Sequence, residues 1–255
     1  MFIDSSIKNS IQDMGINIFL KNYVSSTNDY LKYSYIRDKA PIIILSNNQR
    51  YPRGRREKKW TSHQRHSLGF SICLKFNKNI REYPTLSHLV GLSIVQACST
   101  LNSDQLKIKW PNDIMRGQKK VCGILIENLI STQNVFYSMI GIGFNISIPD
   151  NLIKSIEGYP GNINLPKEKS HLIIGTTISY ILNNISLYEN NGFKNFQHMW
   201  NKNMYAKDKN VILKNHDRKI CGKLLGINEI GELEIKKNNK IINISDTSYS
   251  MRVLE

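Results

Sequence analysis

The pattern of apolar and polar positions predicts strands interspersed with helices over most of the chain. Alternation or a short apolar run is typical of a strand, and such segments are residues 16–24, 41–46, 67–76, 106–110, 121–130 and 135–146. Helical spacing of apolar residues occurs at residues 29–36, 84–101, 167–188 and 192–205. The segment between 47 and 66 has no apolar period and is rich in Arg and Lys. We therefore expect it to be a long exposed loop, and such loops are usually functional or disordered.

The spacing of apolar segments and turn residues changes after about residue 208. Short apolar segments (VILK, KICGKLLGI, GELEIKK, KIINI and MRVLE) are separated by Asn, Gly and Asp. Short strands divided by turn residues are typical of a small all-β barrel. We therefore predict two domains, a large one over residues 1–207 and a small β-barrel domain over residues 208–255.

Composition excludes several classes of protein. With 255 residues and 40% hydrophobic content, the chain can bury a sizeable core. It has no apolar stretch long enough to span a membrane and no signal-peptide pattern at its start. The four cysteines are scattered without metal-ligand spacing, so we expect no metal site. Unpaired cysteines of this kind favour a reducing, cytoplasmic setting.

The net charge of +15 allows two interpretations. One is an anionic partner such as nucleic acid, ATP or an acidic protein. The other is a compositional bias toward Lys, Asn and Ile at surface positions. The basic residues are dispersed along the chain, which favours the second interpretation. The exception is the dense basic run from Arg50 to Lys59.

The segment KWPNDIMRGQKKVCGILIEN, residues 109–128, predicts one long hairpin. Its turn is expected at Asn112 and Asp113, which are turn-forming residue types, and its second strand at Val121. This places Asp113 and Lys120 near the same end of a sheet. Gly123 permits the close approach of a ligand or another backbone. A structural hairpin with no chemical role explains the same residues.

Three other segments also have ordinary structural explanations. Ser25–Asn28 consists of residue types that begin helices. The basic loop can be a solvated run of charge. GIGFN, residues 141–145, contains glycines of the kind that mark bulges in strands.

Taken together, however, these segments resemble the motifs of biotin–protein ligases. In that family, KWPND is followed by a lysine, a Gly-Ile-Leu sequence and a glutamate, and the matching residues here are Lys109, Trp110, Pro111, Asn112, Asp113, Lys120, Gly123, Ile124, Leu125 and Glu127. A hydroxyl-Thr-Asn motif is matched by Ser26, Thr27 and Asn28. The family's arginine-rich loop is matched by Gln49, Arg53, Gly54, Arg55, Arg56 and Trp60, and its Gly-x-Gly-x-Asn sequence ends here at Asn145.

The resemblance covers roughly residues 16–255 and implies a fold and an activity. The fold is α+β: a mixed sheet flanked by helices, like that of class II synthetases, followed by a small barrel-like all-β domain. The activity is formation of biotinoyl-5′-AMP from biotin and ATP with Mg²⁺. Biotin is then transferred to a lysine of the biotin carboxyl carrier protein of acetyl-CoA carboxylase.

The resemblance also implies the roles of individual residues. The expected catalytic residues are Lys120, Asp113 and Arg55. Biotin is expected to contact Ser26, Thr27, Asn28, Gln49, Arg53, Gly54, Arg55, Lys120 and Gly123. ATP is expected to contact Arg53, Arg56, Trp60, Asn112, Lys120 and Asn145.

The chemistry explains these residue types. A carboxylate and the α-phosphate of ATP repel each other, and an ammonium between them, on Lys120, screens the repulsion and stabilises the charge that develops on phosphorus. In the second step Asp113 can orient the incoming lysine or accept its proton. Guanidinium groups suit carboxylate and phosphate.

Two departures from the family pattern bear on the basic loop. Pro52 and Glu57 stand where the family has glycines. Proline removes a backbone donor, and the glutamate adds a negative charge beside phosphate. We therefore expect weaker retention of the adenylate than in relatives, and slower dissociation from a Pro52→Gly variant.

Three rival functions stay open at this point. The first is a lipoate–protein ligase, which shares the adenylation chemistry. The second is a decayed ligase, and the third is a non-catalytic nucleic-acid-binding protein. About 20 residues precede the Ser-Thr-Asn segment, too few for a DNA-binding winged helix, so we expect no DNA partner. The resemblance also implies that the protein can form a homodimer.

Overall fold

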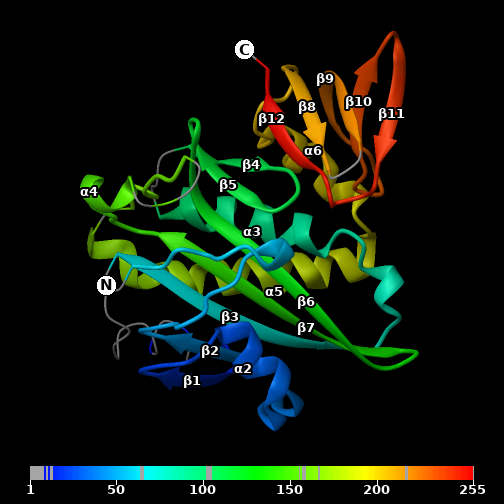
Figure 1. Ribbon diagram of the computed structural model, residues 1–255. Helices are drawn as coiled ribbons and strands as arrows, with labels where there is room; N and C mark the ends of the chain where they lie inside the picture. The colour runs from blue at the N-terminus through cyan, green and yellow to red at the C-terminus, as the bar shows by residue number, and fades with distance from the viewer. Residues whose placement is uncertain are drawn as a thin grey trace.

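The computed structural model describes residues 9, 11, 14–63, 66–101, 105–154, 156, 159–165, 167–215 and 218–254. Within these residues the chain forms two sheets (Figure 1). The larger sheet has seven strands in the order β1-β2-β3-β7-β6-β5-β4. Their bounds are β1 (Asn17–Lys21), β2 (Ile42–Ser46), β3 (Ser67–Phe76), β4 (Lys107–Lys109), β5 (Asp113–Arg116), β6 (Lys119–Thr132) and β7 (Val135–Asn145). Because β1 and β2 are parallel and the other pairs antiparallel, the predicted mixed sheet is confirmed.

Helices cover both faces of this sheet. The bounds of the α-helices are α2 (Thr27–Tyr33), α3 (Leu86–Thr100), α4 (Asp150–Ile153), α5 (Ile173–Asn191) and α6 (Lys194–Lys202). Short 3₁₀ helices are η1 (Tyr35–Lys39), η2 (Arg55–Glu57), η3 (Ile80–Glu82) and η4 (Lys167–Leu172). Figure 1 shows α3 and α5 running side by side behind the sheet.

Strand β2 shows how the sequence separates the two faces. Its five residues are all buried, and they alternate between two hydrophobic clusters. Ile43 and Leu45 join the main core with α3 and α5, whereas Ile42 and Ile44 pack with Leu31 of α2 on the opposite face. Because both faces of such a strand are covered, its sequence is a continuous apolar run.

The C-terminal region forms the second sheet. Its five antiparallel strands lie in the order β11-β10-β9-β8-β12. Their bounds are β8 (Asn210–Lys214), β9 (Lys219–Ile227), β10 (Leu233–Lys237), β11 (Lys240–Ile244) and β12 (Ser250–Val253). The predicted all-β C-terminal region is therefore confirmed.

The two sheets share one hydrophobic cluster. Val211 and Leu224 of the second sheet belong to the same buried cluster as Trp200 of α6 and Ile108 of β4. Strand β4 is also bonded to the end of α6, which leads into the second sheet, because Ile108 N–H donates to the carbonyl of Asn203 at 2.8 Å. The division of the chain at residue 207 stays a prediction.

The single long hairpin predicted for residues 109–128 is wrong. Asp113 begins an additional strand, β5, which pairs with both β4 and β6. The chain turns at residues 110–112, between β4 and β5, and a second time after Arg116, where Gly117 adopts a positive φ of 57°. Ile114 and Met115 are buried in this strand, but two apolar residues are too few to reveal a period.

No helix in the described part of the chain is long and apolar enough to cross a membrane.

Candidate active site

The start of α2 faces the sheet with polar side chains. Ser26 caps the helix, and its Oγ accepts a bond from the Asp29 N–H at 3.5 Å. The three residues Ser26, Thr27 and Asn28 are at most 4% exposed. A buried helix start needs partners for its polar groups, and here they come from the sheet and the basic loop.

Gln49 and Ser71 supply those partners. The N–H and the hydroxyl of Thr27 both donate to Gln49 Oε1, at 2.9 and 3.2 Å. Ser71 of β3 donates to Asn28 Oδ1 at 2.6 Å and lies 2.7 Å from Thr27 Oγ1. The predicted biotin residues on α2 and the loop are thus brought together.

Glycines in β6 and β7 make room for Trp60. A Cβ at Gly143 would lie 2.7 Å from Trp60 Cε2, and a Cβ at Gly123 would lie 2.8 Å from its Cζ3. The indole therefore packs directly against the backbone of Gly123 and Gly143. A close approach was predicted at Gly123, and the group that approaches is the side chain of Trp60 in the basic loop.

Lys120 and Asp113 form an ion pair beside this indole. Lys120 Nζ lies 2.6 Å from Asp113 Oδ1 and 5.2 Å from the ring centroid of Trp60. The Lys120 backbone pairs with Met115 of β5, and its N–H donates to the carbonyl of Tyr159 at 2.6 Å. The expected proximity of the two charged groups is confirmed, although a strand, and not a turn, presents the aspartate.

Arg55 connects the loop to the rest of the molecule. One guanidinium nitrogen donates to Asn112 Oδ1 at 3.0 Å, and the other donates to the carbonyl of Thr247, between β11 and β12. Burial lowers the pKa of Arg55, and the charge of Arg56 lowers it further. Asn112 is held in turn by a 2.8 Å bond to the Ile124 carbonyl.

The loop is less exposed than its sequence predicts. Pro52 is buried, and its carbonyl accepts a bond from the Trp60 N–H at 2.9 Å. Gly54 N–H donates to Lys58 at 2.7 Å. Although the loop has no apolar periodicity, it is held by these backbone hydrogen bonds and by the packing of Trp60 on Gly123 and Gly143.

One pocket collects most of the predicted residues. It has an empty volume of about 530 Å³, including the part open to solvent. Its walls include Ser26, Thr27, Asn28, Gln49, Arg53, Gly54, Arg55, Trp60, Asn112, Lys120 and Gly123. Asp113 does not line the pocket itself, but its carboxylate forms an ion pair with Lys120, which does.

Arg56 and Asn145 do not line the pocket. Arg56 has a positive φ of 54°, and its side chain is exposed. Asn145 is 3% exposed and donates to the Lys120 carbonyl at 3.4 Å. Its Oδ1 is buried and has no hydrogen-bond partner among the described residues, so an acceptor is available beside Lys120.

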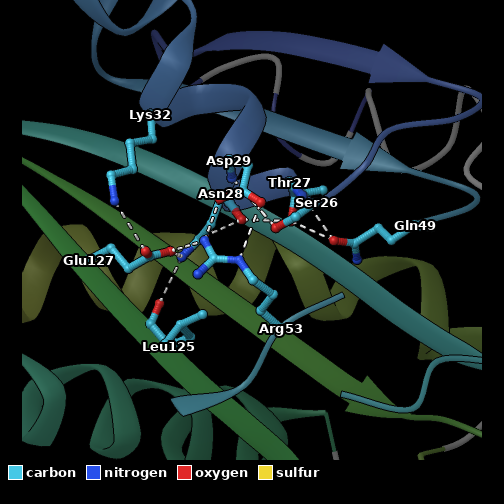
Figure 2. Close-up of polar contacts among 10 residues, drawn as sticks. Ser26, Thr27, Asn28, Asp29, Lys32, Gln49, Arg53, Leu125 and Glu127 are labelled. Carbon is cyan, nitrogen blue, oxygen red and sulfur yellow. Dashed lines mark hydrogen bonds and ion pairs between the residues drawn. The ribbon is translucent and has the colours of Figure 1, made fainter. Parts of the chain in front are cut away.

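Three residues that hold the predicted side chains in place, without lining the pocket themselves, were not predicted as site residues. Ser71, Asp29 and Glu127 contact predicted residues, and the last two meet at Arg53 (Figure 2). A signal existed for two of them: Ser71 is polar within an apolar strand, and Glu127 shares a face of β6 with Gly123 because strand residues alternate. Asp29 carries no comparable signal in the sequence.

The described residues offer no protein-only metal site. They contain no group of three or more His, Cys, Asp or Glu side chains that could hold an ion. The carboxylate of Asp113 is paired with Lys120, and those of Asp29 and Glu127 are paired with Arg53.

Comparison with known sequences extends the likeness to most of the chain. A model of the biotin/lipoate A/B protein ligase family matches residues 20–145. The bifunctional ligase/repressor BirA of Bacillus spizizenii is 26% identical over 238 residues, which cover 91% of this chain and 73% of that protein. The Escherichia coli protein of the same name is 25% identical over 236 residues, with the same two coverages.

A solved structure is similar to most of the chain. The biotin protein ligase from Aquifex aeolicus in complex with biotin and ATP is similar with a TM-score of 0.79 and 26% identity. The similarity covers 93% of this chain and 99% of that one. The likeness therefore includes the C-terminal sheet.

Proposed function

The chain belongs to the biotin–protein ligase family, and from this premise we propose how its pocket performs the reaction. The enzyme joins biotin to AMP at the expense of ATP and transfers the biotinoyl group to a protein lysine. The acceptor is the biotin carboxyl carrier protein of acetyl-CoA carboxylase.

The position of Lys120 supports this proposal most directly. Its ammonium lines the same pocket as the start of α2 and the arginine loop. A fixed cation there reduces the repulsion between the carboxylate of biotin and the α-phosphate of ATP. Asp113, at 2.6 Å, holds that ammonium in place.

Biotin would bind toward α2. The ureido ring carries two N–H donors and one carbonyl acceptor, and hydroxyl and amide groups match them. Ser26, Thr27, Asn28 and Gln49 present such groups, and all four line the pocket. On the opposite wall, Gly123 and Gly143 leave the space in which the indole of Trp60 packs.

ATP would bind on the side of Lys120 and the loop. Arg55 and Arg56 supply guanidinium groups for phosphate, and Trp60 supplies an aromatic face. The unpaired Oδ1 of Asn145 could accept a bond from the adenine amino group. Mg²⁺ would arrive bound to the phosphates of ATP, since it usually binds through substrate phosphates.

In the second step the acceptor lysine must lose a proton before it attacks. Asp113 is the carboxylate beside the reacting centre, and it can orient that amine or accept its proton. The amine attacks the carbonyl carbon of biotinoyl-AMP, the amide bond forms, and AMP leaves as the bond from that carbon to the phosphate oxygen breaks. A closed loop keeps water away from the mixed anhydride meanwhile.

The test is transfer of [¹⁴C]biotin to a carrier fragment of acetyl-CoA carboxylase, with ATP and Mg²⁺. Labelled carrier is the expected product, and a carrier whose acceptor lysine is Arg is the control. Labelling from lipoate but not from biotin would instead favour the lipoate ligase. No ATP–pyrophosphate exchange with biotin would indicate a decayed ligase.

The remaining partners and the compartment are also proposals. Cys73, Cys98, Cys122 and Cys221 are free, which agrees with a reducing, cytoplasmic setting. We expect no DNA partner, and a homodimer is compatible with the family. Salt-dependent binding to DNA would contradict the first expectation.

A further inference from the structure

The second sheet places lysines opposite one another on adjacent strands. Lys214 of β8 pairs in register with Lys219 of β9, and Lys223 of β9 pairs with Lys236 of β10. The Cβ atoms of directly opposed residues lie about 5 Å apart in an antiparallel sheet, and like charges at such positions are destabilising. Two like-charged pairs therefore weaken one small sheet.

Both pairs lie on the same face of this sheet. Because strand residues alternate between faces, Lys219 and Lys223, four residues apart on β9, point the same way. Their sequence neighbours on the other face, such as Leu224 and Ile235, are fully buried in the core. The four lysines are exposed, and together they are called the lysine face: Lys214, Lys219, Lys223 and Lys236.

Few acidic groups neutralise the lysine face. Lys223 Nζ lies 3.6 Å from Asp208 Oδ1, and both side chains are about half exposed or more. Within the described part of the chain, the other three lysines form no ion pair. Glu234 is the acidic residue on the same side of β10. The lysine face therefore keeps a net positive charge.

Apolar side chains lie between and beside the lysine pairs. Ile212 of β8 pairs with Cys221 of β9, between the two pairs, and Ile241 of β11 pairs with Lys236 and is 58% exposed. Strands β8 to β12, as the structure bounds them, contain no aromatic residue on which a nucleic-acid base could stack. An apolar centre with a charged rim is typical of a surface that binds a protein.

The lysine face borders the proposed active site. Arg252 of β12 pairs with Ile212 and so lies on the same side of the sheet. Burial lowers the pKa of Lys109 in β4, and the charge of Arg252 lowers it further. Figure 1 shows β12 as the edge strand on the side of β4 and β5. Because Lys109 pairs with Asp113, a partner on this face is close to the pocket.

We propose that the lysine face docks an acidic face of the carrier protein whose lysine enters the pocket. This inference rests on the proposed function, which requires a protein to approach the pocket and present an amine there. Cations outside the pocket steer an acidic partner into position and select against basic ones. The four lysines act in recognition and touch neither biotin nor ATP.

Charge reversal on the lysine face tests the docking. The double variant Lys214→Glu with Lys236→Glu changes one member of each pair. Lys39→Glu with Lys75→Glu alters two exposed lysines of the other sheet region, changes the net charge equally, and is the matched control. At low ionic strength, kcat/KM for the carrier should fall about tenfold in the lysine-face variant, because loss of steering slows association. The control should keep the wild-type value.

Three readouts separate docking from catalysis and from loss of structure. The difference from wild type should shrink at about 0.5 M salt, where exposed charges are screened. ATP–pyrophosphate exchange with biotin, which involves no carrier, should be unchanged in both double variants. Thermal unfolding of the lysine-face variant should occur at or above the wild-type temperature, since each new glutamate faces a lysine.

Binding measured without biotin or ATP distinguishes the two proposals. The probe is a carrier fragment whose acceptor lysine is Arg, titrated by calorimetry. If the lysine-face variant and the control bind it equally and exchange is normal, the docking is refuted and the ligase proposal stands. If wild type exchanges nothing but binds the fragment through these lysines, the ligase proposal fails and the docking stands. Binding of a DNA duplex through these lysines, with carrier binding unaffected, would also overturn the docking.

Discussion

At the scale of single residues, the proposed chemistry depends on the ammonium of Lys120. Lys120→Ala should slow adenylate formation by about 100-fold or more, because removal of one preorganised charge stabiliser has an effect of that size. ATP–pyrophosphate exchange with biotin measures it. Lys119→Ala removes the exposed neighbouring lysine and should exchange normally; equal rates in the two variants would remove Lys120 from the mechanism.

Gly143 has a steric role that its residue type alone does not reveal. A methyl group there would lie 2.7 Å from Trp60, so Gly143→Ala should displace the indole and raise the KM for ATP by about tenfold, equivalent to 1.4 kcal/mol. Steady-state kinetics measure this effect. In a Trp60→Ala background the same change should have little further effect, and full additivity would contradict the contact.

His88 links stability to pH. It is 4% exposed, and its two ring nitrogens have no hydrogen-bond partner among the described residues. Burial lowers its pKa to about 4, whereas the unfolded chain binds the proton near pH 6.5. The unfolded state therefore gains a proton first as the pH falls, and stability is lost progressively from about pH 6.5 to 4.

The expected loss is about 3 kcal/mol in the free energy of unfolding between pH 7 and 4, since each pH unit between the two pKa values corresponds to about 1.4 kcal/mol. Urea unfolding at several pH values measures it. His88→Gln should lack this part of the pH dependence, and His198→Gln, which alters an exposed histidine, should keep it. Equal slopes for wild type and His88→Gln would show that His88 does not contribute.

At the scale of elements, the basic loop owes its order to contacts outside its own sequence. The sequence leads to the expectation that Pro52→Gly slows release of the adenylate. In the structure Pro52 is buried and its carbonyl closes the loop. Because glycine adds backbone freedom, we expect Pro52→Gly to release biotinoyl-AMP several-fold faster; slower release would reinstate the sequence-based expectation.

At the scale of the whole molecule, the two sheets share a core. Val211 and Leu224 of the second sheet lie in one cluster with Trp200 and Ile108. We therefore expect the full chain to unfold in a single calorimetric transition, with the calorimetric enthalpy equal to the van't Hoff enthalpy. Two resolved transitions would instead support independent domains over residues 1–207 and 208–255.

The sequence by itself determined the elements and most of the pocket. Periodicity located the strands β2, β3 and β7 to within one residue of their bounds, because a strand that is covered on both faces is apolar at most of its positions. Short polar motifs that resemble those of biotin–protein ligases led to Thr27, Arg55 and Lys120, which line the pocket.

Only the tertiary structure decided which groups meet. Strand β5 escaped detection because two apolar residues carry no period, and Asp29 because its partner Arg53 is 24 residues away. Pairing across a fold depends on sheet order and register, which a local pattern does not contain. For the same reason, the position of Trp60 on Gly143 and the contact of Arg55 with Thr247 follow from the fold and not from any motif.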